Sequence, residues 1–159
     1  MRLSGLFGFA LLAMIIGGDI ALADDVFAFV YLPAFLVCAF GTIGLSYLSY
    51  GALDTLRGLR ALTWLVLEPR PDNRSGEDLG GVHRVLKGAV AHLYASGAAG
   101  TFIGVIKIMD FQANGMGRMW RPEPALLVLL PLFYALLLSE FLVRPAARRV
   151  EGLLKDSDR

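Results

Sequence analysis

The sequence predicts an all-α integral membrane protein with four transmembrane helices and a short cytoplasmic helical segment between the second and the third. Two observations support this fold class. The chain of 159 residues is 56% hydrophobic and only 18% charged, whereas soluble domains carry roughly 25% charged residues. The apolar residues also gather into runs of the length that crosses a bilayer, which is about 20 residues. We therefore expect a single membrane domain over residues 1–159.

The four predicted spans are residues 3–23, 26–50, 88–109 and 124–143. The first run has two interpretations. An Ala-Leu-Ala sequence followed by two aspartates is typical of a signal-peptide cleavage site, but the length of the run also suits a retained helix. We expect the retained helix, and the sequence leaves cleavage open.

Basic residues give the expected orientation. Arginine and lysine are frequent in residues 51–87 and after residue 143, while the connection near Asp24 has none. Because positive residues stay on the cytoplasmic side, both termini and residues 51–87 are expected in the cytoplasm. Within that segment, a leucine stripe predicts a helix over residues 52–67, and residues 82–91 are expected to continue into the third span.

Several function classes find no support in the sequence. The net charge of +1 gives no basic excess for nucleic acid, and the only cysteine, Cys38, excludes an intrachain disulfide. Two histidines without nearby acids in the sequence do not form a metal motif, and no nucleophile–base pair, phosphate loop or cofactor motif is present. We therefore predict no enzyme activity, no cofactor and no metal site.

Small residues recur at helical spacing in two of the runs. Such residues let membrane helices approach closely. The third run has Ser96, Gly100 and Gly104 in this register, and the second run has Ala34, Cys38, Thr42 and Ser46. We predict helix packing through both stripes.

Three stretches carry motifs in a fixed order along the chain. The second run has Pro33 and then Phe-Gly-Thr-Ile-Gly around Thr42, the third has Ala-Ser-Gly-Ala-Ala-Gly-Thr-Phe-Ile-Gly from Ala95, and the fourth has Leu-Leu-Pro-Leu-Phe-Tyr-Ala from Leu129. Together they resemble the MotA/TolQ/ExbB proton channel family, most closely a short MotA/PomA-like stator subunit. The stretch in the fourth run departs from the family, because Pro131 and Leu132 replace two threonines.

The resemblance implies a ring-forming subunit of an ion-driven rotary motor in the bacterial inner membrane. In this family a homopentamer surrounds a dimer of a MotB/TolR/ExbD-like single-span protein, and the partner's transmembrane Asp carries the transported H⁺ or Na⁺. The third and fourth spans line the pore. The resemblance places Thr101 at the pore threonine and assigns the ion pathway to Thr101, Gly97, Gly104, Pro131 and Tyr134.

One acid inside a predicted span needs a separate explanation. Glu140 lies one helical turn before Arg144, which is the spacing of a helical ion pair, so we expect a structural pair. Two alternatives to the motor remain open, a small four-span secondary transporter and a non-conducting membrane scaffold. A transporter needs an acid deep in a span, and the middle of every predicted span has none.

Overall fold

The computed structural model describes residue 14 and residues 31–65, 76–113 and 122–157. By its internal contacts the chain divides into Met1–Leu32 and Pro33–Arg159, and the following account concerns the second unit. All regular structure of the described residues is helical, which confirms the predicted all-α class. Apart from residue 14, the predicted span at residues 3–23 lies outside the described residues, and the single domain over residues 1–159 stays a prediction.

The first described helix, α2, runs from Leu32 to Tyr50. Tyr31 is not helical, so this helix begins later than the predicted start at residue 26. Pro33 explains the position of the helix start, because proline fits the first turn, where its missing N–H would have no partner. The predicted residues 26–30 lie outside the described part.

A single residue joins α2 to the next helix, α3, which runs from Ala52 to Leu62. Gly51 has a φ of 81°, a left-handed conformation that favours glycine. Its N–H still donates to the Tyr47 carbonyl at 2.9 Å, while its own carbonyl accepts from the Thr55 N–H at 3.2 Å. The turn between the helices is therefore held from both sides. A 3₁₀ turn, η2, extends α3 over Thr63–Leu65.

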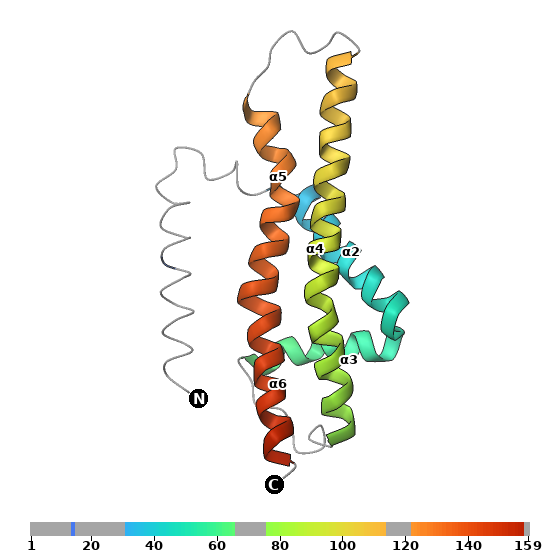
Figure 1. The fold of residues 1–159 in the computed structure, drawn as a ribbon, viewed down its shortest axis with the longest axis vertical. Coiled ribbons are helices and arrows are strands. Elements are labelled where there is room, and N and C mark those ends of the chain that lie inside the picture. The colour runs from blue at the N-terminus through green and yellow to red at the C-terminus, as the bar shows by residue number, and fades with distance from the viewer. Residues whose placement is uncertain (1–13, 15–30, 66–75, 114–121, 158–159) are drawn as a thin grey trace. The chain divides into compact units, whose positions relative to one another are not determined.

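Two long antiparallel rods follow. Helix α4 runs through 38 residues from Gly76 to Ala113, a length of about 57 Å at 1.5 Å per residue. The second rod consists of α5 (Pro122–Leu137), the π-helical segment η4 (Leu138–Val143) and α6 (Arg144–Ser157). Each rod contains one of the predicted spans and continues beyond it, and they lie side by side (Figure 1).

Helix α4 also runs antiparallel to α2. Positions along α2 meet positions on α4 in reverse order: Val37 meets Gly100, Gly41 meets Ser96, Ser46 meets His92 and Tyr50 meets Gly88. Three of these contacts use a glycine, and a Cβ at Gly41 would lie 2.7 Å from the Ser96 Oγ. The close approach of α2 to α4 therefore depends on the small residues predicted to pack.

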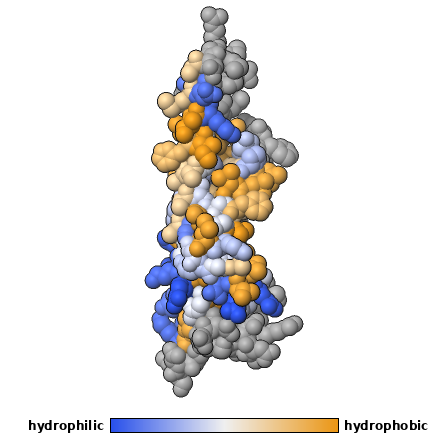
Figure 2. Space-filling model, turned by 90° about the vertical axis from the view of Figure 1, so that its right-hand side faces the viewer, coloured by the Kyte–Doolittle hydropathy of each residue, from blue (hydrophilic) through white to orange (hydrophobic). Residues whose placement is uncertain are grey.

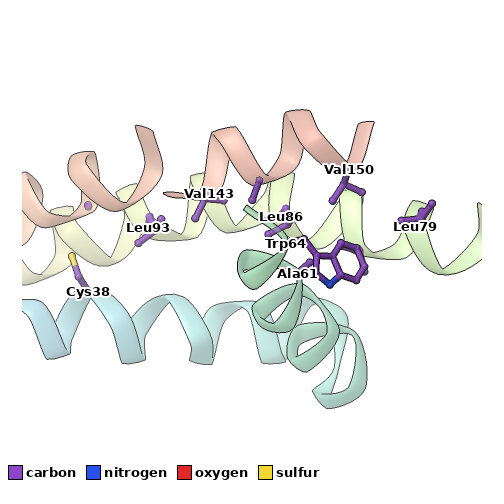
Figure 3. Close-up of a cluster of buried hydrophobic side chains, with 11 residues drawn as sticks. Cys38, Ala61, Trp64, Leu79, Leu86, Leu93, Val143 and Val150 are labelled. Atoms are coloured by element: carbon purple, nitrogen blue, oxygen red, sulfur yellow. The ribbon is translucent and has the colours of Figure 1, made fainter. Parts of the chain in front are cut away.

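The buried side chain of η2 packs between the ends of α4 and α6 that lie away from the α4–α5 contact. Trp64, only 8% exposed, points from η2 into a cluster that includes Leu86 of α4 and Val150 of α6 (Figure 3). Arg149 of α6 donates to the Leu65 carbonyl at 2.8 Å. The end of the α3–η2 segment is therefore fixed against both rods.

Three helical stretches of the described chain are long and apolar enough to cross a membrane: Leu32–Tyr50, Leu79–Asp110 and Leu127–Lys155. Their side chains are largely exposed in the single chain. Figure 2 shows hydrophobic side chains over the middle of one face, with hydrophilic side chains gathered most densely toward the lower end. This distribution is consistent with a membrane-embedded protein.

Candidate functional site

A seam of three glycines joins α4 to α5. A Cβ at Gly97 would lie 2.6 Å from the Ala135 Cβ and 3.0 Å from the Pro131 carbonyl oxygen. At Gly100 it would lie 2.8 Å from the Pro131 Cβ, and at Gly104 it would lie 3.1 Å from a Val128 methyl. The two helices are thus in contact through backbone and ring atoms, which is the packing that small residues permit between membrane helices.

Pro131 lies where α2, α4 and α5 meet. Its ring covers Gly100, and its carbonyl accepts a hydrogen bond from the Cys38 thiol at 2.8 Å. Cys38 is fully buried, so this bond satisfies a polar group that has no access to solvent. Because proline has no N–H, Pro131 also leaves the carbonyl one turn before it without its usual helical hydrogen bond. The structure adds a different role, since Pro131 uses its own carbonyl to connect α5 to α2.

Two hydroxyls beside this junction have no hydrogen-bond partner within the described part of the chain. They belong to Thr101 and Ser96 of α4, and both oxygens are buried. Ser96 faces Gly41 of α2, in a space that the close approach of the two helices fills. A buried hydroxyl without a partner costs about 1–3 kcal/mol, so each of these positions would gain from a partner.

A polar cluster connects α4 to the second rod about one helical turn from Gly97, the nearest glycine of the seam. The Tyr94 hydroxyl donates to Glu140 Oε1 at 2.9 Å and accepts from the Ser139 hydroxyl at 3.0 Å. Arg144 donates to the other carboxylate oxygen of Glu140 at 2.9 Å. Both oxygens of the carboxylate are therefore engaged by side chains of the same chain.

The cluster forms at the π-helical segment η4. The Arg144 N–H bonds to the Ser139 carbonyl, the i→i+5 pattern of a π-helix. Pro145 follows directly, and in an α-helix its ring would meet the Phe141 carbonyl. The wider turn avoids this conflict and turns Ser139 and Glu140 toward Tyr94. π-Helical turns are frequent at functional sites.

A second polar cluster lies between α2 and α4. Both ring nitrogens of His92 are within hydrogen-bond distance of a serine hydroxyl of α2. Nδ1 lies 2.9 Å from the Ser46 Oγ, and Nε2 lies 3.3 Å from the Ser49 Oγ. The Tyr50 ring lies 5.9 Å from the imidazole, centroid to centroid. These contacts make His92 a link between α2 and α4. Among the described residues no group of three His, Cys, Asp or Glu side chains is placed to hold a metal.

The structure brings most of the predicted site residues to the contacts of α4. Gly97, Gly104 and Pro131 lie on the α4–α5 seam, and Tyr134 stacks edge-on against Phe35 of α2 at 5.8 Å. These contacts lie within one chain, so a role in an ion pathway stays a prediction for these four residues and for Thr101.

Most of the residues predicted to pack are buried or lie at a contact between helices. Ala34, Cys38, Ser46 and Ser96 are buried, and Gly100 is covered by Pro131. Thr42 is only partly buried, and its hydroxyl donates to the Cys38 carbonyl of its own helix at 2.6 Å. The expected Glu140–Arg144 pair is present at 2.9 Å.

Sequence reasoning missed the partners of these polar residues. The motifs and spacings of the sequence assigned no role to Tyr94, Ser139 or His92. Their partners lie more than 40 positions away along the chain, and no local pattern indicates such pairs.

Comparison of the chain with protein-family models, curated proteins and solved structures finds no match.

Proposed function

We propose that this chain is the ring-forming subunit of an ion-driven rotary motor in a bacterial inner membrane. Five copies surround a dimer of a single-span partner of the MotB/TolR/ExbD kind. The partner's Asp carries H⁺ or Na⁺ through the ring. The chain crosses the membrane four times with both termini in the cytoplasm. The motif order in the second, third and fourth runs supports this proposal, together with the polar groups described above.

The observation that carries the proposal is the unpartnered Thr101 hydroxyl. The hydroxyl oxygen is buried about two-thirds of the way along α4, in the stretch from Gly97 to Gly104 where the resemblance places a pore threonine. An apolar environment makes an unsatisfied hydroxyl costly. A carboxylate or a hydrated ion that passes this point would accept or donate the missing hydrogen bond, and the hydroxyl would then stabilise the ion in transit.

The engaged state of Glu140 supports the same assignment. A carboxylate that binds and releases a transported ion must exchange its partners, but both oxygens of Glu140 are held by Tyr94 and Arg144. The chain therefore lacks a free acid at this position, and the proposed motor takes its ion-carrying carboxylate from the partner. An elementary charge that crosses 100 mV releases about 2.3 kcal/mol, which is enough to bias each step of the ring.

The secondary-transporter alternative has one residue in its favour, because Glu140 is an ionisable side chain inside a candidate span, and such residues are often functional. Its ion pair with Arg144 and its bond from Tyr94 favour the structural role. A non-conducting scaffold would need neither Glu140 nor the Thr101 hydroxyl for ion movement, so measurements of flux separate the three assignments.

Replacing Thr101 by valine tests the proposal most locally, because valine keeps the shape and removes only the hydroxyl. A hydrogen bond to a charged group is worth about 1.5–3 kcal/mol, so ion flux should fall by roughly tenfold or more. The measurement is voltage-driven flux into vesicles that contain the chain and its co-purified partner, read with a pH- or sodium-sensitive dye.

The matched control is Ser96→Ala. It removes the other buried, unpartnered hydroxyl of α4, which faces Gly41 rather than the proposed pathway. We expect flux within twofold of the unmodified complex for this control. Equal flux for Thr101→Val and the unmodified complex, with assembly intact, would leave Thr101 as a packing residue and remove the main support for the pathway.

A further inference from the structure

The side of α3 that faces away from α4 carries an exposed mixture of leucines and arginines. Leu53 is 72% exposed, Leu56 is 61% exposed and Leu59 is 39% exposed. Arg57 and Arg60 are exposed on the same side. Successive residues turn by about 100° around a helix, so Leu56 and Leu59 form one flank of this surface and Arg57 forms the other.

The opposite side of α3 packs against α4, so α3 cannot rotate about its axis to bury the leucines. Thr55, Gly58 and Ala61 are buried on that side. A Cβ at Gly58 would lie 2.6 Å from a methyl of Val85, so the two helices are in close contact. The leucines therefore stay exposed in the single chain unless another molecule covers them.

The position of α3 points to the edge of a membrane. It begins one residue after the apolar helix α2, and it runs across α4 rather than along it (Figure 1). Arg149 holds the far end of the segment through the Leu65 carbonyl. If α2 and α4 cross the bilayer, a helix with this placement and direction lies along the membrane surface.

The charges around α3 complement an anionic surface. Arg84 and Lys87, close in sequence to Val85 of α4, are also exposed, and Lys87 interacts electrostatically with Glu151 of α6. The only acid of α3, Asp54, is paired with Arg57 at 3.3 Å. A second copy of this chain would bring the same basic side chains to the contact, whereas the cytoplasmic leaflet carries negative charge that attracts basic residues, by about fivefold in binding for each one near the surface.

We propose that α3 is an interfacial helix that inserts Leu53, Leu56 and Leu59 among the acyl chains of the cytoplasmic leaflet and places Arg57 and Arg60 at anionic lipid headgroups. Lipid then covers the leucines, in the way that amphipathic helices bind at membrane interfaces. The proposal rests on membrane embedding of the chain and on the proposed cytoplasmic side of residues 51–87, and it is independent of the motor assignment.

Spin labels at single cysteines test the proposal in vesicles that contain phosphatidylglycerol. With Cys38 replaced by serine, labels are placed separately at Leu56 in α3, at Phe102 in α4 and at Glu151 in α6. Phe102 is 69% exposed on a candidate span, and Glu151 is exposed in the middle of α6, beyond the predicted span at residues 124–143. Collision rates with oxygen report lipid, and collision rates with a water-soluble nickel complex report water.

The proposal predicts that the label at Leu56 collides with oxygen nearly as often as the label at Phe102 and is at least severalfold better protected from nickel than the label at Glu151. Nickel accessibility equal to that of Glu151 would overturn it, because the leucines would then face water. Protection from both reagents, with spin–spin broadening, would also overturn it in favour of a second copy. A water-accessible label at Phe102 would refute the membrane embedding itself.

The arginines provide a second readout. The double variant Arg57→Gln, Arg60→Gln should reduce the retention of phosphatidylglycerol over phosphatidylcholine by about tenfold. Each basic residue contributes about fivefold before screening, and Asp54 offsets part of the contribution of Arg57. Lipid retained by the detergent-solubilised protein is measured by mass spectrometry. An unchanged lipid preference would overturn the assignment of these arginines to anionic headgroups.

Discussion

Replacing Gly97 by alanine is expected to lower the free energy of unfolding by about 1–3 kcal/mol, the usual cost of an extra methyl group in a packed interior. The added Cβ would lie 2.6 Å from the Ala135 Cβ, 3.0 Å from the Pro131 carbonyl oxygen and 3.2 Å from the Leu132 Cα. Two of these are backbone atoms of α5, which cannot move aside as the end of a flexible side chain can. The rods must separate to admit the methyl group.

The measurement is equilibrium unfolding of the purified chain in mixed micelles, followed by tryptophan fluorescence. Gly80→Ala is the matched control, because it lies on the same helix and its Cβ would meet nothing within 4 Å. Alanine is favoured over glycine in a helix by about 1 kcal/mol, so the control should be equally stable or more stable. Equal stability of the two variants would contradict the close contact at the seam.

Removing the Glu140 side chain is expected to be the second large effect. Glu140→Ala leaves Arg144 without its carboxylate partner and Tyr94 without its acceptor. Hydrogen bonds to charged groups contribute about 1.5–3 kcal/mol when buried. Because the Glu140 side chain is 34% exposed, solvent lowers that value, and we expect a loss of about 1–2 kcal/mol in the same unfolding measurement.

The conservative variant Glu140→Gln separates structure from ion transport. Glutamine keeps an oxygen that accepts from Tyr94 and removes the charge. If the carboxylate is structural, this variant should keep flux within twofold while it loses part of the stability. Abolished flux in a stably folded Glu140→Gln complex would contradict the proposal and support the transporter alternative, in which this acid binds the ion.

The elements of the fold followed from local patterns in the sequence. Apolar runs indicated the three described helices that are long and apolar enough to cross a membrane. The small residues indicated where α2 and α5 pack against α4. The spacing of Glu140 and Arg144 indicated their ion pair. The predicted span at residues 26–50 starts before the described helix α2. The apolar pattern continues before Pro33, but the described helix begins at Leu32, where proline fits the first turn.

The links between helices did not follow from the sequence. The Cys38 thiol and the Pro131 carbonyl are 93 positions apart, and the Tyr94–Glu140 bond depends on the π-helical turn at η4. A π-turn shifts all following side chains by one position relative to an α-helix. The α-helical spacing used for prediction therefore placed the Glu140–Arg144 pair but did not indicate that Ser139 and Glu140 face Tyr94.

The most direct test of the motor proposal is native mass spectrometry of the tagged chain, extracted with its associated proteins from the membranes of its source cells. The proposal predicts one complex with five copies of the 17.2 kDa chain and two copies of a single-span protein with an Asp in its transmembrane helix. A stable dimer or trimer of the chain without such a partner would contradict it.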